Sequence, residues 1–96
     1  MYQYNQKVAY IMDESKKLIW AFHSMKKGTF DNDYYFYEDG TIIHRYDISV
    51  RKFNLEKQVS SEDISDYEMK KIIEQCEKEC NSDIVKQIRT ILKLNN

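Results

Sequence analysis

Two histidines and two cysteines are the side chains best suited to acid–base, nucleophilic or metal chemistry in this chain. His23 and His44 stand in no motif such as His-Glu-x-x-His, and neither has a Ser or Cys at a spacing typical of catalytic pairs. Cys76 and Cys80 are one helical turn apart, so both thiols can lie on one face of a helix. A structural zinc site needs four ligands, and no further Cys or close His pair completes one. We therefore expect reduced core thiols, no metal and no catalytic residue.

Carboxylates could also hold a cation or share acid–base work, and they occur here in three groups. Each group is expected in a turn or at the start of a helix, where Asp and Glu ordinarily serve as caps and turn formers. The groups are Asp31 with Asp33, Glu38 with Asp39, and Glu62 with Asp63 and Asp66. Gly28 and Gly40 are the only glycines, too few for a phosphate-binding loop. The sequence therefore indicates a non-enzyme without a cofactor.

The elements that position these residues begin with a β-hairpin over residues 34–46, the clearest structural signal in the chain. A triplet of Glu, Asp and Gly separates an aromatic run from a β-branched run, which is typical of a hairpin turn. With a two-residue turn, Tyr37 pairs with Ile42. With a three-residue loop in which Gly40 is left-handed, Phe36 pairs with Ile42. The hydrophobic pattern favours the three-residue loop.

That register gives the hairpin two faces, because side chains alternate along a strand. The predicted core face holds Tyr34, Phe36, Ile42, His44, Tyr46 and Ile48, and the outer face holds Tyr35, Tyr37, Ile43, Arg45 and Asp47. Tyr and Arg dominate interface hot spots, because they bury large areas and keep a polar end. We therefore predict that Tyr35, Tyr37, Ile43 and Arg45 bind a partner.

The first 28 residues have two interpretations. As strands, residues 7–12 and 17–23 form a hairpin that sets Tyr10 opposite Trp20 and all large side chains on one face. As a single helix over residues 4–26, they leave Tyr10 and Trp20 on the polar side. The hairpin is favoured, and the helix stays open as the alternative.

The last third of the chain is helical. Ser65 and Glu68 form a capping box that starts a helix over residues 66–80, and a second helix is predicted over residues 83–93. Asn81 is expected to end the first helix in a left-handed conformation. Before them, a single turn from Ser61 should pack Ile64, and residues 52–57 should add a short edge strand.

These elements predict one α+β domain over residues 1–96. It is an antiparallel β-meander of about four strands, packed on one face by the two C-terminal helices. The strands are predicted at residues 7–12, 17–23, 33–37 and 41–48, with the extra edge strand at 52–57. No stretch approaches the roughly 20 apolar residues that span a bilayer, so we expect a cytoplasmic protein without a membrane partner.

Charge and composition bear on the partner. The net charge is −1, and residues 60–82 hold seven acids against three Lys, a local charge of −4. We expect a protein-binding module, either heterotypic or a homodimer, of the inhibitor, immunity or counter-defence kind found on phages and mobile elements. The alternative is a nucleic-acid-binding regulator. Its candidate residues are Arg45, Arg51 and Lys52 on the sheet side, or Lys86, Arg89 and Lys93 on the last helix.

Overall fold

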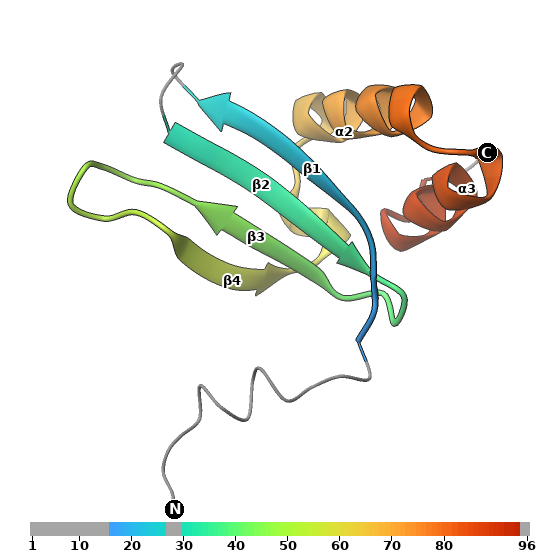
Figure 1. The fold of residues 1–96 in the computed structure, drawn as a ribbon, viewed down its shortest axis with the longest axis horizontal. Helices are drawn as coiled ribbons and strands as arrows, with labels where there is room; N and C mark the ends of the chain where they lie inside the picture. Colours follow the sequence, from blue (N-terminus) through green and yellow to red (C-terminus); the bar gives the residue numbers. More distant parts are fainter. Residues whose placement is uncertain (1–15, 27–29, 95–96) are drawn as a thin grey trace, which may run out of the picture.

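The computed structural model describes residues 16–26 and 30–94. Four antiparallel strands form one sheet in the order of the chain: β1 (Leu18–Lys26), β2 (Phe30–Tyr37), β3 (Ile42–Tyr46) and β4 (Leu55–Val59). A 3-10 turn, η1 (Ser61–Asp63), leads to helices α2 (Asp66–Glu79) and α3 (Ser82–Ile91) (Figure 1). The predicted α+β fold, with an antiparallel sheet and two C-terminal helices, is confirmed.

The first predicted hairpin is tested only in its second half. Residues 7–12 lie outside the described residues, so their proposed pairing stays a prediction. Residues 18–26 form a strand, so the alternative helix over residues 4–26 is wrong for this stretch. Trp20 and Phe22 pair with Phe36 and Tyr34 on the core side, whereas a helix would have left Trp20 among polar residues.

The register of the second hairpin is confirmed. Phe36 lies opposite Ile42, and Gly40 has a φ of +91°. Its N–H donates to the carbonyl of Tyr37 at 2.9 Å, and the Asp39 carboxylate accepts the Thr41 N–H at 2.9 Å. A Cβ at position 40 would meet nothing within 4 Å, so glycine is needed there for its backbone conformation, not for space.

The third strand ends earlier than predicted and the fourth starts later. The strand predicted at 41–48 spans Ile42–Tyr46, and the edge strand predicted at 52–57 spans Leu55–Val59. Residues 47–54 form a hairpin loop between them, closed by a bridge between Ser49 and Lys52. Ile48 therefore lies in the loop and is 57% exposed, so its predicted place in the core is wrong.

The core lies between the inner face of the sheet and the two helices. Its buried side chains are Phe22, Tyr34, Phe36, Ile42, Ile64, Ile72, Ile73, Cys76, Ile88 and Leu92. Ile64 is buried directly after η1, as predicted. Cys76 is buried and Cys80 partly buried, and both thiols are free. Burial, and next the neighbouring Cys80, raise the pKa of Cys76, so this thiol is an inert core group.

The helix boundaries follow from their caps. Ser65 accepts the Glu68 N–H at 3.2 Å and starts α2 as predicted. Asn81 is extended, with a φ of −75°, and its side chain accepts the Ile84 N–H at 2.9 Å. The predicted left-handed stop at Asn81 is wrong, because this side chain caps the start of α3 instead. Neither described helix has the length and apolar character that crossing a membrane requires.

Candidate protein-binding face

The outer face of the sheet is built by two rows of directly paired residues that cross all four strands. Paired residues on neighbouring strands share a face, and none of these residues belongs to the core cluster. One row is Ala21, Tyr35, Ile43 and Gln58, and the other is His23, Asp33, Arg45 and Glu56. The face therefore combines aromatic, aliphatic and charged groups opposite to the side that the helices cover.

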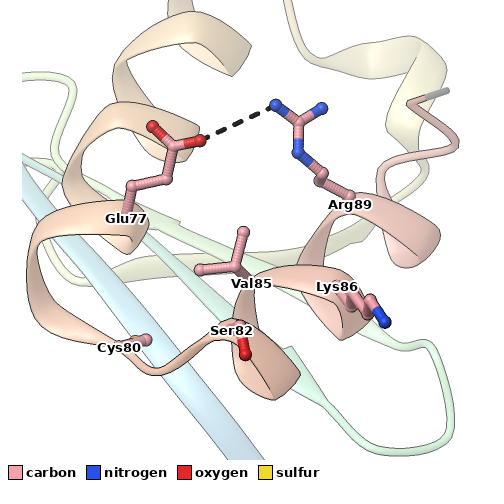
Figure 2. Close-up of a pocket in the computed structure, with 6 residues that line it drawn as sticks. All are labelled: Glu77, Cys80, Ser82, Val85, Lys86 and Arg89. Atoms are coloured by element: carbon pink, nitrogen blue, oxygen red, sulfur yellow. Dashed lines mark ion pairs between the residues drawn. The ribbon is translucent and has the colours of Figure 1, made fainter. Parts of the chain in front are cut away.

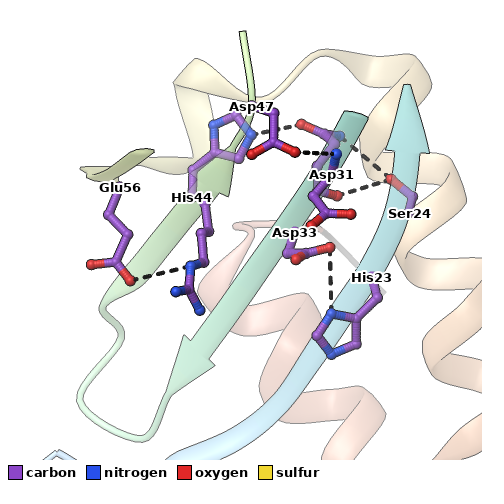
Figure 3. Close-up of polar contacts among 9 residues, drawn as sticks. His23, Ser24, Asp31, Asp33, His44, Asp47 and Glu56 are labelled. Atoms are coloured by element: carbon purple, nitrogen blue, oxygen red, sulfur yellow. Dashed lines mark hydrogen bonds and ion pairs between the residues drawn. The ribbon is translucent and has the colours of Figure 1, made fainter. Parts of the chain in front are cut away.

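Two loose charged contacts run along the second row. His23 Nδ1 lies 3.4 Å from Asp33 Oδ1, and Arg45 Nε lies 3.8 Å from Glu56 Oε2 (Figure 3). Arg45 Nε is itself enclosed and has no hydrogen-bond acceptor within the described residues. The Arg45 and Glu56 side chains are both about two-fifths exposed (43% and 40%). Such exposed pairs contribute little to stability.

The tyrosines hold neighbouring side chains in place. The rings of His23 and Tyr35 meet edge to face with centroids 5.8 Å apart. Hydrogen bonding to Tyr35 raises the pKa of the Arg45 guanidinium. Partial burial, followed by the charge of Glu56, raises the pKa of Tyr37. Both tyrosines are partly buried on this face.

The structure places all four predicted partner-binding residues on this one face. Tyr35 and Ile43 are directly paired, and Arg45 follows two residues further along β3. Tyr37 ends β2 and pairs with Leu18, a residue 51% exposed. All four side chains are partly buried, which leaves them preorganised and still accessible.

A polar cluster on the inner face shows the contrasting arrangement. Glu68 accepts hydrogen bonds from Tyr34 Oη at 2.8 Å and from Asn32 Nδ2 at 2.7 Å. His44 Nε2 lies 2.7 Å from Asn32 Oδ1, and because the amide nitrogen of Asn32 donates to Glu68, the imidazole is the donor in this bond. Ser24 Oγ donates to the Asn32 carbonyl (Figure 3). This cluster joins α2 to the sheet and places His44 on the inner face as a partly buried, hydrogen-bonded residue.

Sequence reasoning missed His23, Asp33 and Glu56 on the outer face. The alternation of β1 would have placed His23 beside Ala21, but its position opposite Asp33 follows only from the pairing of β1 with β2. A second missed feature is the loop between β3 and β4, which exposes three large apolar side chains: Ile48, Val50 and Phe53. The sequence carried a signal for this exposure, because polar and charged residues separate these three apolar residues from one another.

A surface pocket of about 470 Å³ lies between the helices, at the junction of α2 and α3 (Figure 2). Arg89 and Glu77 form an ion pair beside it at 3.7 Å, so one of the cations predicted for nucleic acid is engaged within the chain. The pocket lining contains no His and no carboxylate other than Glu77. Within residues 16–26 and 30–94, no three His, Cys, Asp or Glu residues gather as a metal site would require.

Comparison of the chain with protein-family models, with curated proteins and with solved structures gives no match. The geometry of the outer face is therefore the basis for inferring a function.

Proposed function

We propose that this protein is a non-catalytic protein-binding module that docks a basic protein surface on the outer face of its sheet. The observation that supports this is the alignment of Tyr35, Tyr37, Ile43 and Arg45 on paired strands, away from the helices. Aromatic rings and an arginine held on paired strands lose little conformational freedom on binding, so most of their burial contributes to affinity.

The charge of the face indicates the chemistry of the partner. Asp31, Asp33 and Glu56 occupy outward positions of the paired strands, against the single guanidinium of Arg45. A surface with three carboxylates and one permanent cation attracts Lys- and Arg-rich protein surfaces and steers their approach. Tyrosine hydroxyls then supply hydrogen bonds to those cations. A module of this kind acts by occupying its partner, as inhibitor, immunity and counter-defence proteins do.

The same charges weigh against two other partners. A nucleic acid would bring phosphates toward Asp31, Asp33 and Glu56, and the cost of that repulsion rises at low salt. A second copy docked face to face would oppose two acidic surfaces. A basic heterotypic partner is the one for which the face is complementary.

Affinity capture from the native cell tests the proposal. We expect the wild-type chain to retain a protein with a basic surface, and the double variant Tyr35→Ala, Tyr37→Ala to retain on the order of a hundredfold less, since two central aromatic anchors are removed. Raising the salt concentration should weaken capture moderately, whereas a phosphate-driven complex would weaken steeply.

Tyr67→Ala is the matched control, because Tyr67 is 71% exposed on α2, away from this face. It should capture as well as wild type. Equal capture by the double variant, or nuclease-sensitive capture of nucleic acid, would show that the outer face is not the protein-binding surface.

A further inference from the structure

The loop between β3 and β4 is a well-built hairpin. The Asp47 carboxylate closes its base by accepting the N–H groups of Asn54 at 2.8 Å and Asp31 at 3.0 Å. At the tip, Ser49 and Lys52 exchange backbone hydrogen bonds at 3.0 Å. Asn54 completes the return with a φ of +54°, a conformation that non-glycine residues adopt rarely. The loop is thus held in one shape by its own hydrogen bonds.

This shape exposes apolar side chains that a loop would ordinarily hide. Ile48 is 57% exposed, Val50 81% and Phe53 57%, so half of the six exposed large hydrophobic residues in the described chain lie within six consecutive positions. In Figure 1 the loop extends beyond the ends of β3 and β4, at the end of the sheet that lies farther from α3. Concentrated exposed apolar surface marks an interaction site.

Two cations stand among these apolar residues. Arg51 and Lys52 are both exposed, and no salt bridge joins either of them to another described residue. The one neutral hydroxyl of the tip, Ser49 Oγ, is turned inward and accepts the N–H groups of Arg51 and Lys52 at 3.2 and 3.1 Å. The tip therefore presents apolar surface and positive charge. Its one neutral hydroxyl group is already engaged in hydrogen bonds within the loop.

We propose that this tip, residues 48–53, inserts into the interface of an anionic lipid bilayer. Val50 and its apolar neighbours would enter the boundary between headgroups and acyl chains, while Arg51 and Lys52 remain at the level of the lipid phosphates. To bind an anionic bilayer, a protruding tip needs only apolar side chains and positive charge. A protein partner is less well matched, because the tip is convex and Val is under-represented among interface hot spots.

Peripheral insertion requires no membrane-spanning helix, so it revises the expectation of no membrane partner without conflicting with the helices described here. The tip is also separate from the outer face, since it shares no residue with the two paired rows. Binding at one surface can therefore be measured independently of the other.

Co-sedimentation with lipid vesicles tests the proposal. The full chain should sediment with vesicles that contain phosphatidylglycerol and remain in solution with vesicles of phosphatidylcholine alone. The double variant Arg51→Ser, Lys52→Ser should lower the partition coefficient roughly 25-fold, since each cation near an anionic surface contributes a factor of about five. Val50→Ser combined with Phe53→Ser should lower it by on the order of tenfold or more.

Two control variants match these changes elsewhere on the surface. Lys70→Ser with Lys71→Ser removes the same charge from α2, and Tyr67→Ser removes an aromatic side chain whose exposure lies between those of Val50 and Phe53. Both should reduce sedimentation much less than the tip variants. Failure of the wild type to sediment with anionic vesicles overturns the proposal. So does an equal loss in tip and control variants, or a tip variant that loses captured protein while vesicle binding is unchanged.

Discussion

The two faces of the sheet use similar residues in opposite ways. On the inner face, the rings of Tyr34 and His44 stack in parallel with centroids 4.3 Å apart, and Tyr34 Oη donates to Glu68 at 2.8 Å. On the outer face, a tyrosine and a histidine meet only edge to face at 5.8 Å, and the imidazole lies 3.4 Å from a carboxylate. The inner contacts are shorter and centre on the buried Tyr34, whereas the outer ones are longer and partly exposed.

This difference teaches that residue type alone does not separate a structural group from one available for binding. A buried polar cluster strengthens its hydrogen bonds and penalises any member left unpaired. An exposed cluster exchanges its contacts with water at little cost. Inner-face substitutions should therefore lower stability, and outer-face substitutions should mainly lower partner binding.

The largest expected effect comes from deleting a fully buried ring. Phe36→Ala should lower the free energy of unfolding by about 3–5 kcal/mol, because Phe36 has no exposed surface and its removal leaves a cavity. Tyr37→Ala, the neighbouring residue on the outer face, should cost roughly 1 kcal/mol. Urea unfolding of the two variants measures the difference. Equal losses would mean that the faces are not distinct in packing.

A matched pair of glutamate substitutions sharpens the comparison. Glu68→Leu should lower the free energy of unfolding by about 2 kcal/mol or more, since it leaves Tyr34 Oη and Asn32 Nδ2 without their acceptor. Glu56→Leu removes a loose outer-face pair and should cost less than about 1 kcal/mol. Thermal and urea unfolding give both values, and a larger cost for Glu56→Leu would reverse the assignment of the faces.

Alkaline pH should reveal how much the buried Tyr34 contributes to stability. Burial first, and then the hydrogen bond and charge of Glu68, raise the pKa of Tyr34 well above its ordinary value. The folded state therefore holds this proton more tightly than the unfolded state. The resulting stability is fully present below about pH 10 and declines as pH rises beyond it. Tyr34→Phe should flatten this decline more than Tyr37→Phe does, which urea midpoints across this pH range would show.

The smallest effect is expected at the base of the loop between β3 and β4. Hydrogen bonds from the Asn54 and then the Asp31 N–H lower the pKa of Asp47, so the ordering it provides is lost as pH falls below about 4, through that lowered value. Asp47→Ala should speed amide hydrogen exchange at Asn54. Asp39→Ala, which removes the acceptor for Thr41, should leave Asn54 unchanged. Similar exchange at Asn54 in both variants would show that Asp47 does not order the loop.

Local signals made the second hairpin predictable. Gly40 is the residue in its turn that adopts a positive φ without strain, and the alternation of aromatic residues fixed the register with Phe36 opposite Ile42. Caps at Ser65 and the short turn before Ile64 were predictable for the same reason. In each case, the deciding contact lies within a few residues of the chain.

Long-range contacts were not predictable in this way. Glu68 fits a local capping box, yet its carboxylate binds Tyr34, which is 34 residues earlier in the chain. The alternation of Trp20 and Phe22 fits any neighbouring strand, so their pairing with β2 could not be derived from the pattern. Asn81 suits either a helix end or a helix start, and the choice depends on where α3 begins.

The most direct test of the proposed binding face is hydroxyl-radical footprinting of the chain, alone and with the protein it captures. Because this method reports on individual side chains, it distinguishes the two faces of one strand. Oxidation of Tyr35 and Tyr37 should fall on binding, while oxidation of the exposed Tyr67 should be unchanged. Unchanged oxidation of Tyr35 and Tyr37, with protection at Tyr67 or at Phe53 instead, would contradict it.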